Sequence, residues 1–522
     1  MPNLSSIQGL DKKIENILFD YLKVESFTNT QGEELVDAFF NKTISEMSYF
    51  KDHPELYGQY ETGDKNFDRH INYAFYKGHS DTYVMIHHSD VVNVDNYADY
   101  KKLAFEPSNL ANAFLEDDNF LSREAMEDLH SGNFLFGRGV ADMKAGGSIE
   151  LALLDYYSCS GMGPSILVIA VPDEENESLG MRAAIRLLKD LKDEHQLSYK
   201  LMINTEPHQR IQSERGVISQ GSIGKLNVFV HVKGVLAHAG KALEGINPNG
   251  LLARIVSEVD LNDDFVNVTE SEMSIPPTWV MMRDNKKVYD ISFPSMSYGI
   301  LNILNYTDTP SDVLGKLKKL IQTALDDYLE HINMKRLKFS SKTGRNWKCF
   351  NKSDNVFTLD EYLAFRNESG KPLDYPEDIE ALMCKSNDDE PLIVIGILPP
   401  YYPAVTNVEQ SELIDLVNEF TLKNYNQTYD NRMYFTGISD LSYSKLPSKN
   451  IEEEMKNIMG WKTKYYIPFE ILESVEMPCI NIGPWGKDFH KPSERVFKED
   501  VFERTPNIID YIIRNYKGGK YV

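Results

Sequence analysis

Two histidines and several carboxylates stand in short segments that each follow an apolar run or a glycine-rich turn. The segments are HHSDVV with His88, FGRGVADMKAGG with Asp142, VPDEEN with Glu174 and Glu175, NTEPH with Glu206, and GPWGKDFHKP with His490. Imidazole and carboxylate groups in this combination are the ligands expected for zinc, manganese or cobalt, rather than for calcium or a soft metal. The residue types therefore predict a metal centre.

Such a set of ligands suits the hydrolysis of an amide bond. A neutral amide is a poor electrophile and water is a poor nucleophile, so both need activation in one small site. Two divalent ions roughly 3.5 to 4 Å apart can lower the pKa of bound water from about 15.7 toward about 7 and can hold both reacting oxygens. One carboxylate must then bridge the ions, and another must carry the proton.

Each of these residues alone also has a simpler interpretation. A single histidine at a strand end is more often a hydrogen-bonded structural residue, and Glu174 beside Glu175 resembles a solvated acidic run. The two glutamates follow a buried apolar run, however, where unpaired charge is unfavourable. The glycine-rich turn could bind phosphate, but the sequence has no GxxxxGK[ST] signature. We assign structural roles to three other histidines, His87, His208 and His231.

Buried strands are needed to carry these segments to a common edge. Four apolar runs end abruptly in polar residues, as buried parallel strands do: Tyr83–Ile86, Ile166–Val171, Leu201–Ile203 and Cys479–Ile482. Amphipathic helical stretches lie between them, at Ala145–Tyr157 and Met181–Leu191. The alternation predicts an α/β fold with a mixed, mostly parallel sheet. Open sheets of this kind bind ligands at the carboxyl ends of their strands.

The pattern changes from about Ile223, where Leu226, Val228, Val230 and Val232 alternate mostly with polar residues, as in a half-exposed antiparallel strand. A helix near 251–259, strands near 279–283 and 299–306, and a long helix with an N-cap at Ser311 follow. These elements predict an inserted α/β two-layer sandwich. The polar stretch from about residue 335, with its basic island, is interpreted as a solvated elaboration of this domain.

Three segments therefore describe the predicted domains. Residues 1–213 form the first part of a catalytic domain, and residues 214–390 form the inserted domain. The apolar run LIVIGILPP then starts the segment 391–522, which we expect to complete the first domain.

The composition restricts the partners. The 522 residues carry 79 acidic and 55 basic side chains, for a formal net charge of -24, which repels nucleic acid and anionic membranes. The four cysteines are scattered without CxxC spacing, as expected of a reducing compartment. The N-terminal residues lack a basic region followed by an apolar stretch, and no window approaches the roughly 18 apolar residues of a spanning helix. We expect a cytoplasmic protein with a small-molecule or short-peptide substrate.

The ordered set of segments resembles metallopeptidase family twenty, the aminoacylase, carboxypeptidase-G and peptidase-T group of di-zinc exopeptidases. The resemblance lies in HSD followed by VV, then GRGVADMKAG, PDEE, TEP, GVLAHAG, and GPWG ahead of a His-Lys-Pro-Ser-Glu run. The segments YFTGISDLSY and LPPYYPAV resemble the arginine-utilisation branch of that family. The resemblance implies a zinc-exopeptidase-like catalytic domain with helices on both faces of its sheet, and an inserted lid or dimerisation domain through which a homodimer would form.

The resemblance also implies a role for each residue that occupies a matching position in the family's segments. Asp142 would bridge two divalent ions, zinc first and manganese or cobalt as alternatives. The remaining ligands would be His88 and Glu206 at one ion, and Glu175 and His490 at the other. Glu174 would be the general base, Asp90 would orient His88, and His238 of the inserted domain would stabilise the oxyanion. The Asp142–Met143 peptide bond would be cis.

Departures from the family pattern affect the substrate more than the metals. The run NILNYTDTP, Asn302–Pro310, stands where many relatives carry an Asp-x-Arg strand, so no arginine is assigned to bind a substrate carboxylate. His87 replaces a glycine and Asn93 replaces a proline. Glutamate at position 206 resembles the carboxypeptidase and deacylase members. We expect a zinc-dependent hydrolase of short peptides or N-acyl amino acids, in arginine or amino-acid catabolism. The alternative is a catalytically inactive metal-binding protein that serves assembly or ligand sensing.

Overall fold

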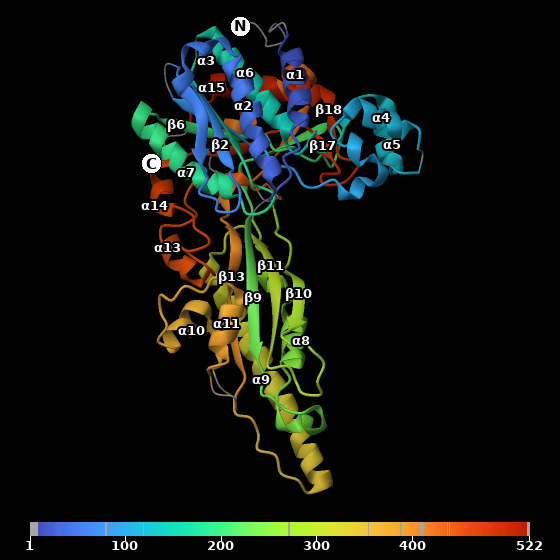
Figure 1. Ribbon diagram of the computed structural model, residues 1–522, viewed down its shortest axis with the longest axis vertical. Helices are drawn as coiled ribbons and strands as arrows, with labels where there is room; N and C mark the ends of the chain where they lie inside the picture. The colour runs from blue at the N-terminus through green and yellow to red at the C-terminus, as the bar shows by residue number, and fades with distance from the viewer. Residues whose placement is uncertain are drawn as a thin grey trace. The chain divides into compact units, whose positions relative to one another are not determined.

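The computed structural model describes residues 9–78, 81–117, 119–161, 163–269, 272–352, 354–386, 389–407, 412–435, 437 and 439–518. The chain divides into two compact units, each built around its own sheet (Figure 1). Unit 1 comprises Met1–Ser222, Val405–Leu446 and Ile467–Val522, and unit 2 comprises Ile223–Ala404 and Pro447–Tyr466. Within the described ranges, no helix has both the length and the apolar character that a membrane crossing requires.

Within its described residues, unit 1 contains an eight-stranded mixed sheet. In spatial order its strands are β1 (Tyr57–Glu61), β2 (His70–Tyr76), β5 (Ser165–Val171), β3 (Thr82–His88), β6 (Tyr199–Asn204), β16 (Cys479–Asn481), β7 (Arg215–Ser219) and β15 (Thr428–Arg432). The neighbours β5, β3, β6 and β16 run parallel to one another, whereas β1 and β2 are antiparallel. These four parallel strands are the four apolar runs of the sequence, so their predicted parallel arrangement is confirmed.

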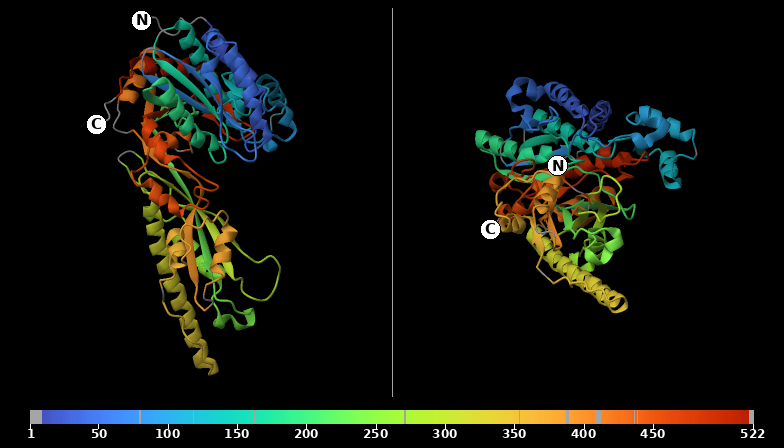
Figure 2. Two further views of the ribbon diagram at one scale, coloured as in Figure 1. Left: turned by 60° about the vertical axis from the view of Figure 1, so that its left-hand side comes forward. Right: turned by 60° about the horizontal axis from the view of Figure 1, so that its bottom comes forward.

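Helices cover both faces of this sheet, as the two views of Figure 2 show. The helices of unit 1 are α1 (Leu10–Leu22), α2 (Leu35–Ser45), α3 (Ser48–Asp52), α4 (Pro107–Leu115), α5 (Arg123–Ser131), α6 (Lys144–Ser160), α7 (Leu179–His195), α12 (Glu412–Tyr425), α14 (Phe469–Val475) and α15 (Thr505–Asn515). His87 of β3 packs against α6, and Phe75 of β2 packs against α7. Through the register, Phe75 lies on the same face as Val84, which is opposite to His87 along β3. The predicted α/β fold is confirmed.

The described residues of unit 1 also form two small sheets. One pairs β14 (Val405–Thr406) with β8 (Gly221–Ser222). The other has the order β17 (Gly486–Lys487), β18 (Arg495–Phe497) and β4 (Phe134–Phe136). This second sheet brackets the loop that carries His490.

Unit 2 contains a five-stranded sheet among its described residues. Its strands, in spatial order, are β10 (Thr278–Asp284), β11 (Met296–Asn305), β9 (Gly224–Lys233), β13 (Leu392–Tyr402) and β12 (Val356–Thr358). Its helices are α8 (Pro248–Val259), α9 (Pro310–Thr343), α10 (Leu359–Phe365), α11 (Pro376–Met383) and α13 (Ile451–Glu454). Strand β9 is antiparallel to both β11 and β13, as its alternating sequence predicts.

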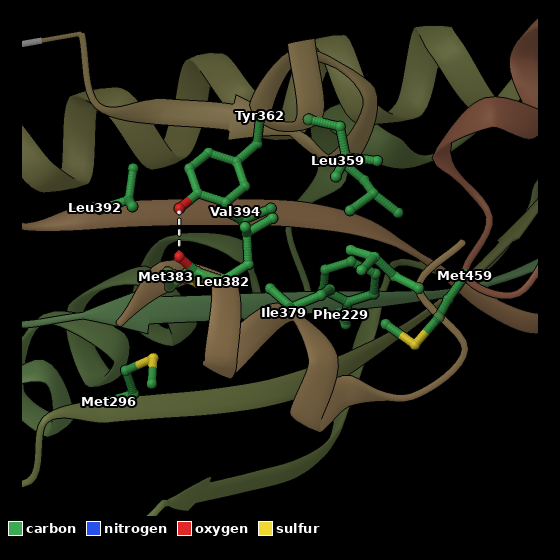
Figure 3. Close-up of a cluster of buried hydrophobic side chains, with 12 residues drawn as sticks. Phe229, Met296, Leu359, Tyr362, Ile379, Leu382, Met383, Leu392, Val394 and Met459 are labelled. Carbon is green, nitrogen blue, oxygen red and sulfur yellow. Dashed lines mark hydrogen bonds between the residues drawn. The ribbon is translucent and has the colours of Figure 1, made fainter. Parts of the chain in front are cut away.

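The prediction that β9 is half-exposed is wrong, because side chains on both of its faces are buried. On one face Phe229 and Val394 of β13 belong to one buried cluster with Tyr362 of α10 and with side chains of α11 (Figure 3). On the other face Val228 and Val230 are also fully buried, and α8 and α9 both contact this sheet. Phe229 alternates with Val228 and Val230 along β9, so its side chain lies on the opposite face of the sheet. Helices α10 and α11 cover that face and therefore add a layer to the predicted two-layer sandwich.

The strand β13 belongs to unit 2, where it pairs with β9 and β12. The predicted inserted domain spans residues 214–390, whereas unit 2 begins at Ile223, continues to Ala404 and also includes Pro447–Tyr466. An apolar run that is buried on both faces gives the same sequence signal in either sheet, and only its pairing partners distinguish the two.

The long helix α9 begins earlier than predicted. Thr309 is its N-cap, and its hydroxyl accepts a hydrogen bond from the backbone N–H of Asp312 at 3.2 Å. The predicted N-cap at Ser311 is therefore wrong by two residues. Pro310 takes the first helical position, where its missing N–H needs no partner.

Candidate metal centre

Five segments of unit 1 carry the candidate ligands. His88 ends β3, Glu174 and Glu175 follow β5, Glu206 follows β6, Asp142 precedes α6, and His490 lies between β17 and β18. The strands β5, β3 and β6 are parallel neighbours, so their carboxyl ends meet at one edge of the sheet. The topology therefore brings the ligands together from positions that are far apart in the sequence.

The carboxylate of Asp142 lies between the two histidines. Its Oδ1 is 2.9 Å from Nε2 of His88, and its Oδ2 is 3.1 Å from Nε2 of His490. Each imidazole nitrogen also faces one glutamate: Oε1 of Glu206 lies 3.3 Å from His88, and Oε1 of Glu175 lies 2.9 Å from His490. The site thus consists of two histidine–glutamate pairs that share one aspartate.

This donor set has the composition and spacing of a cation site. His88, Glu174 and Glu206 can each place one ligand atom within 4.8 Å of the others, and so can His88, Asp142 and Glu175. Burial, together with the charge of Asp142, raises the pKa of Glu206 to about 7. Carboxylates that share a buried site disfavour one another's charged forms, and divalent cations relieve that repulsion. The residues therefore fit divalent metal ions.

The histidines and carboxylates of the site shift one another's pKa values. Hydrogen bonds with Asp142 and Glu175 raise the pKa of His490 to about 10. Although burial acts in the opposite direction, hydrogen bonds from His490 and His88 lower the pKa of Asp142. Without metal, His490 thus holds a proton near neutral pH, which a metal ion would displace because it binds the neutral imidazole.

The side chain of Asp90 makes closer contacts with the two glutamates than with His88. Nδ1 of His88 lies 3.0 Å from the backbone carbonyl oxygen of Asp90, but 3.6 Å from its carboxylate. That carboxylate instead accepts hydrogen bonds from the backbone N–H groups of Glu174 at 3.1 Å and Glu175 at 3.2 Å. Asp90 therefore orients His88 through its main chain and positions the glutamate turn through its side chain.

Glu494 is a site residue that the sequence analysis does not single out. Its Oε1 accepts hydrogen bonds from the backbone N–H groups of Ala141 and Asp142, each at 3.3 Å, and its Oε2 pairs with Arg138. Both charged side chains are buried. Glu494 lies in the same loop as His490, so it joins the two segments that carry the central aspartate and the second histidine. Glu494 is the last residue of the His-Lys-Pro-Ser-Glu run, which enters the sequence argument only through the family resemblance.

Asp440 is a second residue that the sequence analysis does not assign. Burial raises the pKa of this carboxyl group to about 7. Its neighbour Ser439 accepts a hydrogen bond from the side chain of Asn204, at the end of β6, at 3.0 Å. Ser439 and Asp440 therefore lie next to the end of the strand that leads to Glu206.

The other predicted features lie as follows. The Asp142–Met143 peptide bond is cis, as the family resemblance implies. His238 lies in unit 2 with an exposed side chain, whereas all the candidate ligands lie in unit 1. Its catalytic role stays a prediction. His208 and His231 are buried, as expected of structural histidines.

Comparison with known proteins identifies the family. The sequence model of the peptidase family M20/M25/M40 matches residues 117–515. The chain belongs to this family. The chain is 28% identical over 523 residues to the uncharacterized protein YqjN of Bacillus subtilis strain 168, with 95% of each chain covered. It is 26% identical over 551 residues to protein RocB of the same strain, with 97% of this chain and 96% of RocB covered.

A solved structure shows the same fold. The M20 family metallo-carboxypeptidase Sso-CP2 from Sulfolobus solfataricus matches with a TM-score of 0.55 at 14% identity, over 96% of this chain and 98% of that one. The membership predicted from the sequence segments is confirmed. Family and fold together support a metal-dependent hydrolase.

Proposed function

We propose that the protein is a two-metal hydrolase that cleaves the amide bond of a short peptide or an N-acyl amino acid. The placement of Asp142, with one carboxylate oxygen against His88 and the other against His490, carries this proposal. Asp142 would bridge the two ions, with His88 and Glu206 holding one of them and His490 and Glu175 holding the other. Zinc is the expected ion, and manganese and cobalt are alternatives with similar donor preferences.

Glu174 holds and moves the proton in this mechanism. When bound, the ions supply polarisation of the substrate carbonyl and a lowered pKa for water. The Glu174 carboxylate accepts a proton from the attacking water and returns it to the nitrogen of the leaving amine. Burial and the charge of Glu175 raise the pKa of Glu174 well above its ordinary value, which supports the return of the proton near neutral pH.

Two further residues assist in this proposal. Asp90 holds the backbone of the glutamate turn, so that Glu174 and Glu175 face the same site. His238 donates a hydrogen bond to the oxyanion that forms during attack. Its Nδ1 accepts from the backbone N–H of Gly240 at 3.1 Å, which leaves Nε2 to donate. The GVLAHAG segment, which resembles that of the family, supports this assignment.

We also propose that unit 1 is the catalytic domain and that unit 2 is a lid or dimerisation domain. Strand β10 is an edge strand, and its side chains Val280 and Met282 are 62% and 46% exposed. Tyr289 and Ile291, in the following turn, are exposed as well. Apolar side chains gathered at a sheet edge favour pairing with a second copy. Light scattering on the purified protein tests this, with a Val280→Lys, Met282→Lys double variant expected to be monomeric.

The proposed setting is arginine or amino-acid catabolism in the cytoplasm. The segments YFTGISDLSY and LPPYYPAV, together with the similarity to RocB along nearly the whole chain, support the arginine branch. The four cysteines are free, which agrees with a reducing compartment.

Metal analysis of the purified protein, combined with a hydrolysis screen, tests the proposed function. The protein would be assayed with zinc, manganese or cobalt against a panel of dipeptides and N-acyl amino acids, including N-acyl arginines. Two ions per chain and release of a free amino acid support the proposal. Two ions without turnover across the panel favour the inactive metal-binding protein, and a protein that binds no metal overturns the metal centre itself.

A further inference from the structure

Two consecutive glycines of α6 lie directly against the residues that precede two of the candidate ligands. A Cβ atom on Gly146 would come within 2.4 Å of Oγ1 of Thr205, which precedes Glu206. A Cβ atom on Gly147 would come within 2.5 Å of the ring of His87, which precedes His88. Helix α6 therefore approaches the ends of β3 and β6 more closely than a larger residue would allow.

One turn further along α6, a single carboxylate binds both of these residues. Oε2 of Glu150 lies 2.8 Å from Nδ1 of His87, and Oε1 accepts a hydrogen bond from the hydroxyl of Thr205 at 2.7 Å. The hydroxyl of Tyr21 lies 3.3 Å from the other ring nitrogen of His87. The side chain of Glu150 is completely buried, so both of its oxygens are directed by these contacts rather than by solvent.

The bridge lies where backbone pairing between the two strands ends. The last register pair of β3 and β6 is Ile86 with Asn204. His87 and Thr205 come next along the two strands, and His88 and Glu206 follow them. Beyond that last pair, the Glu150 carboxylate connects the two strand ends through its hydrogen bonds with His87 and Thr205. These two residues immediately precede the candidate ligands His88 and Glu206.

We infer that Glu150 is a positioning residue for the metal ion that His88 and Glu206 share, an assignment that rests on the proposed function. By holding His87 and Thr205 to one carboxylate, Glu150 sets the separation of the two ligands that follow them; Nε2 of His88 and Oε1 of Glu206 are 3.3 Å apart. Groups behind metal ligands commonly change metal affinity by about 10- to 100-fold when removed. The two hydrogen bonds of Glu150 go to the residues that precede His88 and Glu206, so its effect is expected at the ion that these two ligands share.

Zinc titration of the apo-protein by calorimetry tests this assignment without relying on turnover. Glu150→Ala removes both hydrogen bonds and is expected to weaken one of the two zinc ions about 10- to 100-fold, with the other unchanged. Glu150→Gln keeps an acceptor for His87, and its amide can donate to the Thr205 hydroxyl, so it is expected to recover most of the lost affinity. Ser148→Ala is the matched control, because Ser148 is equally buried on α6 and its hydroxyl donates a hydrogen bond to the Lys144 carbonyl within the same helix.

The outcomes separate this inference from the proposed function. If Glu150→Ala fails to fold, as judged by circular dichroism, Thr205→Val replaces it, because it removes one of the hydrogen bonds at nearly constant shape. A smaller loss at the same single ion is then expected. A folded variant that binds both ions as the wild type does, or that loses both equally, overturns the positioning role alone. A wild-type protein that binds no zinc overturns the proposed function and this inference with it.

Discussion

Oε1 of Glu494 lies 3.3 Å from the backbone nitrogen of Asp142 and accepts its hydrogen bond. The other oxygen of Glu494 pairs with Arg138, and the two side chains are 0% and 1% exposed. A carboxylate from the His490 loop therefore holds the main chain of the segment that carries the central aspartate. This contact makes the metal centre depend on a charge pair that never reaches solvent.

Glu494→Ala is expected to destabilise the protein strongly. It removes the carboxylate that balances the buried charge of Arg138, and breaking a buried pair in this way typically costs about 3 to 5 kcal/mol. Urea unfolding measures the loss. Glu127→Ala is the control, because Glu127 pairs with Arg123 on the surface, where the side chains are 63% and 92% exposed, and no measurable change is expected. Equal stability of the two variants would contradict a structural role for the Glu494 pair.

Glu174→Gln is expected to lower turnover about 100- to 10,000-fold, because an amide cannot accept the proton of the attacking water. The metal content should remain that of the wild type, since the proposed ligands are unchanged. Steady-state kinetics and elemental analysis of the same preparation measure the two quantities. Full activity of the variant would exclude Glu174 as the general base.

Zinc binding is expected to release protons and to strengthen as the pH rises from about 6 to about 8. The pKa of His490 is raised to about 10 and that of Glu206 to about 7, so the metal-free site holds protons at neutral pH. Zinc binds the deprotonated forms, so raising the pH removes the competitor. Calorimetric titrations in buffers with different ionisation enthalpies count the protons released. An affinity that does not vary across this pH range would exclude these protonated groups as ligands.

Gly147→Ala is expected to destabilise the protein by about 1 to 3 kcal/mol, as overpacking of a core does. The added methyl group would meet the His87 ring at 2.5 Å. In a double-mutant cycle, His87→Ala should relieve part of this cost, because the two positions share one space. Gly315→Ala in α9 is the control; nothing lies within 4 Å of a Cβ atom there, and the substitution should stabilise the helix by about 0.5 to 1 kcal/mol. Strictly additive effects of Gly147→Ala and His87→Ala would contradict the contact.

Local patterns were sufficient to predict the elements that carry the site. The parallel strands at the centre of the unit 1 sheet are continuous apolar runs, and burial on both faces produces that pattern without reference to any partner. The same property misplaced Leu392–Tyr402, which reads like a central strand of unit 1 but pairs with β9 in unit 2. Hydrophobicity reports burial, whereas strand pairing depends on long-range contacts.

The structural histidine at position 87 illustrates a second limit. His87 precedes His88 in β3, so its side chain lies on the opposite face of the sheet from that ligand. Its partner Glu150, however, lies 63 residues away on α6, and the Thr205 contact lies a further 55 residues along the chain. No spacing rule connects the three. Gly146 and Gly147, which leave space for these contacts, belong to a segment that the sequence marks only as a glycine-rich turn.

The sequence by itself determined the family, the α/β fold of unit 1 and the types and order of the candidate ligands, because each is marked by a local pattern of residues. Only the tertiary structure decided that Asp142 lies between His88 and His490, the latter 348 residues away along the chain, and that Glu494 and Glu150 support the segments around them. These relationships depend on strand order and on how loops close. They form when packing buries segments that are distant in the sequence against one another, and such packing leaves no periodic signal in the sequence.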